Sequence, residues 1–271
     1  MININNIADK FSIEYKKCII SFVSSKVNRR RSESIGSGFF VSYNGEKFLL
    51  TARHVIEEVK TALKEKRSTI IVGYENAIEL HLKNVITFQE IDAAIIPIDW
   101  MIGHQNLKDI FFPNISFSEA AIDPYYGMFM GYPAAKNQND LYGDTQKRML
   151  FGYGGVREKE IGAVDGVYIP LGFSMNINKS IAGINRPPES TVSPRPQGIS
   201  GGPVIGIHCK SDGRGGIDES SFIHEICGIA VSQIRAFDFN NRGVFVAESL
   251  FSIKNTLDDI CMSMKRGSSY S

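Results

Sequence analysis

Short strand-like runs separated by turn residues dominate this sequence. One example is the Asn44-Gly45 pair, which separates the apolar runs at residues 36–42 and 47–51. Asn-Gly between two apolar runs is a strong signal for a β-hairpin. Such runs form two groups, one ending near residue 98 and the other beginning near residue 127. This pattern predicts an all-β protein, built as two β-barrels or as a sandwich.

Two segments have apolar residues at helical spacing, so we expect helices there. They are residues 55–66, directly after His54, and residues 250–264, which we expect to pack on the second group of strands. Residues from about 99 to 123 lack regular periodicity and predict a connection between the groups. Residues 178–197 are rich in Pro, Ser, Arg and Asn, which is typical of a long loop.

The charge balance argues against nucleic acid or an anionic membrane as the main partner, because 30 Lys and Arg face 29 Asp and Glu. The first residues show no basic start followed by an apolar run, so we expect no secretory signal and a cytoplasmic location. No stretch approaches the ~20 apolar residues of a membrane span. The cysteines are therefore expected to be free thiols. They are Cys18, Cys209, Cys227 and Cys261.

The motif Gly198-Ile199-Ser200-Gly201-Gly202-Pro203 precedes an apolar run. A serine hydroxyl is a poor nucleophile until a base takes its proton. Glycine two residues before the serine lets the backbone turn, so that the N–H groups of Gly198 and Ser200 can face one developing oxyanion. The alternative is a glycine-rich turn before a strand, with a serine facing solvent.

Two further motifs could supply the base and its partner. His54 follows the apolar run Phe48 to Ala52, at the rim of a packed core, where an imidazole can accept a proton near neutral pH. Asp92 opens the apolar run that follows it and could orient the imidazole, whereas the competing Glu90 would point to the other face. Each motif alone is equally compatible with an ordinary surface or strand-end residue.

Taken together, the three motifs make the chain resemble the chymotrypsin–trypsin superfamily, and within it the bacterial trypsin-like peptidases that include the high-temperature-requirement proteases. The similarity lies in the order His, Asp, Ser and in the matched residues. These are Thr51-Ala52-Arg53-His54-Val55, Asp92-Ala93-Ala94-Ile95-Ile96, Gly131-Tyr132-Pro133, Gly198 to Pro203, Gly228-Ile229-Ala230 and Gly243-Val244-Phe245.

The resemblance implies two antiparallel six-stranded β-barrels in one trypsin-like peptidase domain covering residues 1–271. The expected divisions are a first barrel at about 15–100, a linker at about 99–123, a second barrel at about 124–250 and a C-terminal helix at about 250–264. It also implies a serine endopeptidase acting on protein or peptide substrates without metal or organic cofactor. In that mechanism His54, Asp92 and Ser200 form the catalytic triad, and Gly198 and Ser200 form the oxyanion hole.

Two departures from the family concern activation and specificity. Secreted digestive members have Asp where this chain has Ile199, so activation by a newly cut N-terminus does not apply. The oxyanion hole is then either preformed or ordered by a partner protein, ligand or oligomer. The expected specificity pocket has no carboxylate from Pro194 to Ser200, which favours a small or apolar P1 residue. Its expected lining residues are Pro194, Val231, Ser232, Gln233 and Gly243.

Two other readings stay open. One is a trypsin-fold binding or scaffold protein with little turnover, which the complete set of His, Asp and Ser argues against. The other is a different acyl-transfer enzyme, such as an esterase. An α/β-hydrolase would need its serine at a strand-to-helix elbow and the order Ser, acid, His, and the strand-rich pattern here opposes that.

Overall fold

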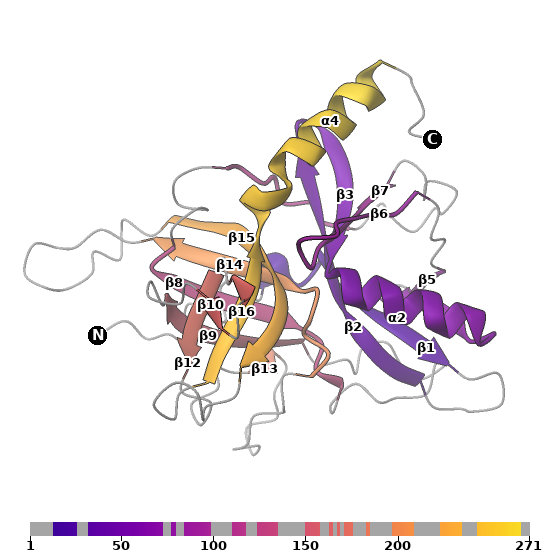
Figure 1. The fold of residues 1–271 in the computed structure, drawn as a ribbon, viewed down its shortest axis with the longest axis horizontal. Helices are drawn as coiled ribbons and strands as arrows, with labels where there is room; N and C mark the ends of the chain where they lie inside the picture. Colours follow the sequence, from indigo (N-terminus) through magenta and orange to yellow (C-terminus); the bar gives the residue numbers. More distant parts are fainter. Residues whose placement is uncertain are drawn as a thin grey trace, which may run out of the picture.

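The structure is a computed structural model in which most of the described backbone is β-strand. Its strands form two seven-stranded antiparallel sheets and a separate two-stranded pair (Figure 1). The expected all-β class and the two groups of strands are thus confirmed. The described residues are 13–25, 32–72, 77–79, 84–98, 110–117, 124–134, 150–157, 163–164, 167–168, 171–175, 183–184, 197–208, 223–234 and 243–266.

The first sheet is built from the N-terminal part of the chain. In spatial order its strands are β5 (Ala77–Glu79), β4 (Ser68–Val72), β1 (Ile19–Ser25), β2 (Ser32–Tyr43), β3 (Glu46–Thr51), β7 (Ala94–Pro97) and β6 (Ile86–Thr87). The predicted hairpin turn joins β2 to β3 at Asn44 and Gly45, whose φ angles are 51° and 87°. Both residue types reach positive φ at low cost, so this turn matches the twist of the strands that it joins.

The second sheet is built from the C-terminal part. In spatial order its strands are β12 (Leu171–Met175), β16 (Gly243–Ser249), β15 (Ile223–Ile234), β14 (Pro203–His208), β8 (Tyr126–Gly131), β9 (Leu150–Arg157) and β13 (Gly183–Ile184). Strand β12 pairs with β9 as well as with β16. The short strands β10 (Ala163–Val164) and β11 (Val167–Tyr168) pair with each other. Closure of each sheet into a six-stranded barrel stays a prediction.

Apolar side chains from the strands fill the core. All four residues of β7 are buried, as expected for the apolar run that follows Asp92. In the second sheet the rings of Phe173 and Phe245 pack against Phe129, with centroids 5.5 Å and 5.0 Å away. The apolar-rich stretch at residues 78–88, which by its pattern would predict one strand, contributes to two separate strands, β5 and β6, and Asn84, with φ of 61°, precedes β6.

Helix α2 (Arg53–Lys64) begins beside His54, close to the predicted start of the first helix. It buries one face, made by Val55, Ile56, Val59 and Ala62, and exposes Glu57, Glu58, Lys60 and Lys64. The amphipathic pattern therefore explains both the helix and its docking on the first sheet. None of the helices in the described ranges is long and apolar enough to cross a membrane.

The last helix is present, and it contacts both groups of strands. Its start, the 3-10 turn η7 (Leu250–Ile253), packs on β15 of the second sheet, as predicted. Helix α4 (Lys254–Lys265) follows and lies beside the turn that joins β2 to β3 in the first sheet (Figure 1). Tyr43 Oη donates a hydrogen bond to Asp258 Oδ1 at 2.7 Å, and the Cys261 thiol lies 3.5 Å from the Tyr43 carbonyl oxygen. The chain thus returns to the first sheet at its C-terminal end.

The predicted connection between the groups is described only at residues 110–117, where it follows β2 without forming a regular strand. Ser42 donates its N–H to the Pro113 carbonyl, and Ile115 donates its N–H to the Ser42 carbonyl, both at 2.9 Å. This segment therefore pairs with the end of β2 before the chain enters the second sheet. Cys18, Cys227 and Cys261 are buried free thiols, and Cys209 lies outside the described residues.

Candidate active site

His54 and Asp92 form a hydrogen-bonded pair at one end of the first sheet. The ring Nδ1 of His54 lies 2.6 Å from Asp92 Oδ2, and the backbone N–H of His54 donates to Asp92 Oδ1 at 3.0 Å. His54 comes from the first turn of α2, and Asp92 from the irregular segment before β7. Both carboxylate oxygens are thus engaged by one residue, which leaves Nε2 of His54 available for other contacts.

The pKa values of the two residues move in opposite directions. Burial lowers the pKa of His54, but the hydrogen bond and charge of Asp92 outweigh it, with help from the charges of Glu58 and Glu57, so this pKa is raised. Burial raises the pKa of Asp92, but the hydrogen bonds and charge of His54 outweigh it, so this pKa is lowered. An ionised Asp92 beside a readily protonated imidazole suits a histidine that takes up a proton.

Ser200 lies in the turn before β14, and its backbone is tied to the first sheet. The Ser200 carbonyl accepts the N–H of Ser37 at 2.7 Å. A Cβ on Gly36 would lie 3.0 Å from the same carbonyl oxygen and 2.6 Å from a methyl group of Val55, the residue after His54. The next residue, Gly201, packs so closely on Ser37 and Thr51 that it has no room for a side chain. Gly36 therefore contacts both the Ser200 backbone and the residue after His54.

The Ser200 hydroxyl donates its hydrogen bond to the carbonyl of Val231, at 3.1 Å, and not to His54. The Val231 carbonyl belongs to β15, which pairs with β14 directly after the Ser200 turn. For the hydroxyl to give its proton to His54 Nε2, the side chain has to leave this carbonyl. Rotation about one side-chain bond between staggered rotamers is a small change.

Two backbone N–H groups, those of Gly198 and Ser200, have no acceptor among the described residues. The Gln197 carbonyl accepts the N–H of Ala134 at 2.6 Å, and the Gly198 carbonyl accepts the Ser37 hydroxyl at 2.8 Å. In a trans peptide the C=O and N–H bonds point in opposite directions, so the Gly198 N–H points away from Ala134. Within the described ranges, neither this N–H nor that of Ser200 donates to protein.

Glycine is required at position 198 for steric reasons. Its φ is 95°, and an added Cβ would lie 2.7 Å from the nitrogen of Ala134 and 2.8 Å from the oxygen of Tyr132. The following Ile199 is only 4% exposed and packs in the core of the second sheet. Two hydrogen bonds, a crowded glycine and a buried isoleucine thus fix this turn.

Three of the expected pocket residues lie on β15, where the Val231 carbonyl accepts the Ser200 hydroxyl. Val231 is buried and Ser232 is exposed, and Gln233 pairs with Phe245 of the neighbouring strand β16. Gly243 begins β16 and pairs with Met175. Pro194 lies outside the described residues.

A residue that the sequence analysis missed reaches Asp92 from the other sheet. Glu248, near the end of β16, accepts the backbone N–H of Asp92 on its Oε1 at 3.1 Å. Its signal in the sequence is only a carboxylate directly after the apolar run Val244 to Ala247. Burial raises the pKa of Glu248 and so does the charge of Asp92, while the hydrogen bond from Asp92 N–H and the charge of Arg53 oppose the rise.

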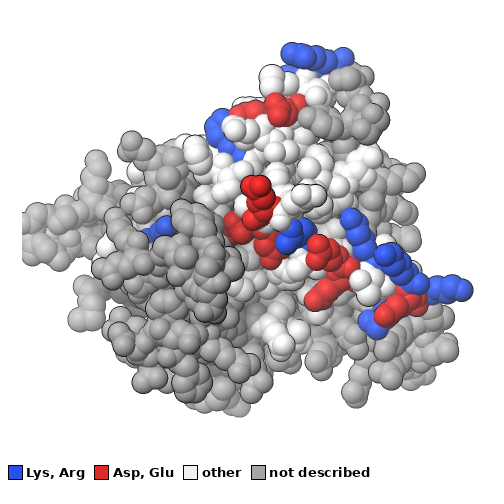
Figure 2. Space-filling view, viewed as in Figure 1, with Lys and Arg blue, Asp and Glu red and all other residues white. Residues whose placement is uncertain are grey.

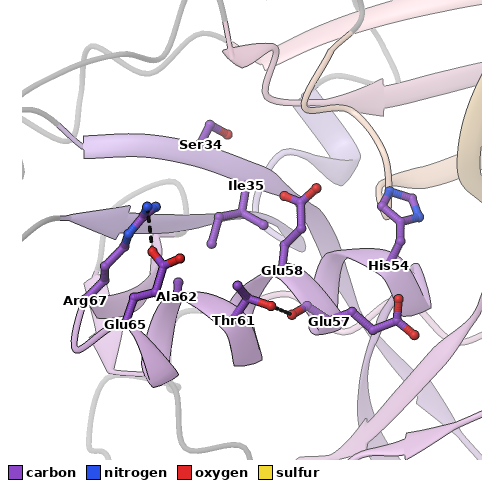
Figure 3. A pocket seen from close by; sticks show the side chains of 9 residues that line it. All are labelled: Ser34, Ile35, His54, Glu57, Glu58, Thr61, Ala62, Glu65 and Arg67. Carbon is purple, nitrogen blue, oxygen red and sulfur yellow. Dashed lines mark hydrogen bonds and ion pairs between the residues drawn. The ribbon is translucent and has the colours of Figure 1, made fainter.

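A groove of about 440 Å³ runs along α2, with His54 at one end (Figure 3). Three glutamates line it, and Arg67 at the other end is paired with one of them, Glu65, at 2.7 Å. Acidic side chains also gather over the beginning of α2 on this face (Figure 2). Among the described residues, no group of three or more His, Cys, Asp and Glu side chains is placed to hold a metal ion.

Comparison with known proteins identifies the fold. No model of a known protein family matches the sequence, and no curated protein is significantly similar to it. Among solved structures, a serine endoprotease from Yersinia pestis matches with a TM-score of 0.50 and 14% identity, over 96% of this chain and 67% of that one. The chain has a trypsin-like serine protease fold.

Two further solved structures are forms of one mycobacterial protease. The active form of the Rv3671c protease from M. tuberculosis matches with a TM-score of 0.47 and 14% identity, over 92% of this chain and 83% of that one. The inactive form matches with a TM-score of 0.43 and 13% identity, over 94% of each chain.

Proposed function

We propose that this chain is a serine endopeptidase that hydrolyses peptide bonds through an acyl-enzyme. The observation that carries the proposal is the His54–Asp92 pair, in which Asp92 Oδ2 lies 2.6 Å from the ring Nδ1 of His54. A carboxylate on Nδ1 fixes the tautomer in which Nε2 can accept a proton, and stabilises the imidazolium that then forms. Among the described residues, Ser200 lies in a turn held against the segment just before His54.

In the proposed mechanism the Ser200 hydroxyl turns from the Val231 carbonyl to His54 Nε2. Its oxygen attacks the substrate carbonyl while its proton moves to Nε2, and the resulting oxyanion is held by the N–H groups of Gly198 and Ser200. His54 then gives the proton to the leaving amine. Water then hydrolyses the acyl-enzyme ester. His54 takes a proton from the water as it attacks the ester carbonyl, and gives a proton back to the Ser200 oxygen as the acyl group leaves. The mechanism needs neither metal nor organic cofactor.

The contacts around Gly198 support an oxyanion hole that is preformed, without an activating partner. The Gln197 and Gly198 carbonyls already have donors in Ala134 and Ser37, and Ile199 is buried where an activating Asp would stand in secreted relatives. We therefore expect the purified chain to turn over a good peptide substrate alone. Activity that appears only with an added protein or oligomer would favour partner activation instead.

The single trypsin-like domain over residues 1–271 and the cytoplasmic location are part of the same proposal. For specificity we propose a small or apolar P1 residue, because the expected pocket brings no carboxylate from residues 194–200 and lies beside Val231. A peptide library varied at P1 should show Ala, Val or Leu cleaved faster than Arg. A strong preference for Arg would contradict this assignment.

The alternative is a binding or scaffold protein with little turnover. The observation that favours it is the Ser200 hydroxyl, which is bonded to Val231 O and not to His54. The two functions differ in whether Ser200 reacts with an electrophile that mimics an acyl group.

A fluorophosphonate probe tests this difference. The parent chain should be labelled at Ser200, and Ser200→Ala should lose the label completely. His54→Ala should slow labelling by several powers of ten, because the base is gone. Ser252→Ala, an exposed serine in η7, is the matched control and should label like the parent. Absence of label on the folded parent chain would favour the binding protein.

A further inference from the structure

Glu248 makes a contact between the two halves of the protein at the proposed active site. It stands on β16 of the second sheet, and its Oε1 accepts the backbone N–H of Asp92, which belongs to the first half. The two residues are 156 positions apart in the chain. Among the described residues, the acceptor for the Asp92 N–H is this carboxylate.

The backbone of Asp92 lies in a segment that no strand fixes. Residues 89–92 form bends between β6 and β7, so their N–H groups do not take part in sheet pairing. A buried or half-buried N–H without an acceptor is unfavourable, and Oε1 of Glu248 supplies that acceptor. The bond to Glu248 therefore ties the Asp92 main chain to the second sheet.

The position of Asp92 in turn sets that of His54. Both the ring Nδ1 and the backbone N–H of His54 bond to the Asp92 carboxylate. A shift of Asp92 is thus transmitted to the imidazole, and misplacement by about 1 Å can cost about a hundredfold in rate.

The surroundings of Glu248 fit this role. Its other oxygen, Oε2, is buried and has no hydrogen-bond partner among the described residues, so the side chain is directed to Asp92 by one bond only. The charged groups that act on it are Asp92 and Arg53, and Arg53 is itself anchored on the carbonyls of Phe88 and Gln89 at 2.8 Å and 2.7 Å.

We propose that Glu248 is a positioning residue that holds the Asp92 backbone from the second sheet and so sets the geometry of the His54–Asp92 pair. This inference rests on the proposed function, since it assigns Glu248 a part in the same site. Glu248 acts through the acceptor oxygen Oε1 and not through its charge. A glutamine at this position keeps that oxygen, while alanine and methionine remove it.

The experiment compares Glu248→Gln, Glu248→Ala and Glu248→Met with the parent, and uses Glu90→Gln as control. Glu90 is an exposed carboxylate two residues before Asp92, so the control removes a nearby charge without removing the contact. For hydrolysis, Ala and Met should lower kcat by roughly ten- to a hundredfold with KM within about twofold. Gln and the control should stay within about twofold of the parent.

The second measurement needs no turnover. In the Ser200→Ala background, NMR titration of His54 and the downfield signal of its Nδ1 proton report the His54–Asp92 pair directly. Ala and Met should lower the pKa of His54 and weaken that signal, and Gln should leave both unchanged. Methionine has nearly the length of glutamate, so it decides the matter if the alanine variant does not fold.

The outcomes separate this inference from the proposed function. If Glu248→Gln and Glu248→Ala have equal effects, Glu248 acts through its charge. If neither Glu248→Ala nor Glu248→Met has an effect, Glu248 does not position Asp92. Either result overturns the inference. If the parent neither hydrolyses peptides nor reacts with a fluorophosphonate, the proposed function fails, while the titration of His54 still decides the role of Glu248.

Discussion

Replacing Asp92 by Asn removes the carboxylate charge while preserving the size of the side chain, so it tests the His54–Asp92 pair directly. The contact is 2.6 Å long, which puts the two charge centres about 4 Å apart, worth about 4 kcal/mol at an effective dielectric constant of about 20. The side chains are 37% and 26% exposed, and solvent screening reduces this to about 2 kcal/mol. The lost charge alone then slows acyl transfer about 30-fold.

The Asn amide also changes the tautomer. Its NH₂ group can donate to Nδ1, which moves the ring proton to Nε2 and blocks that nitrogen as a base. A histidine left in the wrong tautomer can bring the total loss of kcat to about 10⁴-fold. The pKa of His54 should fall, because burial, which lowers it, stays while the opposing Asp92 contribution is removed.

The assay is the rate of fluorophosphonate labelling and of peptide hydrolysis over pH 5 to 9, with NMR titration of His54. Glu90→Gln is the matched control, since it removes an exposed carboxylate two residues away and should keep the parent rate. If folded Asp92→Asn keeps more than about a tenth of the parent kcat/KM near neutral pH, then Asp92 does not orient the base and the reasoning is refuted.

Two other substitutions and one pH dependence test the structure further. Gly198→Ala should lower kcat by about 10²–10³-fold, because its Cβ would meet Ala134 N and Tyr132 O and turn one oxyanion donor away; an unchanged rate would contradict that hole. The ion pair of His54 and Asp92 should stabilise the fold at pH values between the pKa of Asp92 and the pKa of His54. Its contribution is lost as pH falls through the lowered pKa of Asp92 and as pH rises through the raised pKa of His54, so the parent and Asp92→Asn should differ most in Tm between them. Tyr43→Phe should lower the free energy of unfolding in urea by about 1 kcal/mol without changing kcat, because it removes the hydrogen bond to Asp258; a loss of activity would show that α4 influences the site.

Much of the fold follows from local sequence patterns. The Asn44-Gly45 turn and the apolar face of α2 are local signals, because positive φ and helical spacing each depend on neighbouring residues. The spacing of apolar residues in 250–264 predicted helix α4, but it did not predict that α4 contacts the first sheet. A periodic pattern shows which face of a helix is apolar, and it does not show which surface covers that face.

The candidate site divides in the same way. His54, Asp92 and Ser200 each stand in a recognisable motif, and the pairing of His54 with Asp92 is present in the structure. Glu248 has no motif, and its contact with Asp92 joins segments 156 residues apart, so only the folded arrangement reveals it. The orientation of the Ser200 hydroxyl toward Val231 also depends on a tertiary contact, since the carbonyl belongs to β15.

The position of α4 has a consequence for synthesis of the protein. Leu257 and Ile260 of this helix are fully buried in the same cluster as Phe40 and Leu49 of the first sheet, although they are translated some two hundred codons later. A growing chain on the ribosome therefore carries an open apolar surface until its final segment emerges. Nascent chains should depend on chaperones for that interval, and a premature stop codon before position 254 should yield a product that aggregates.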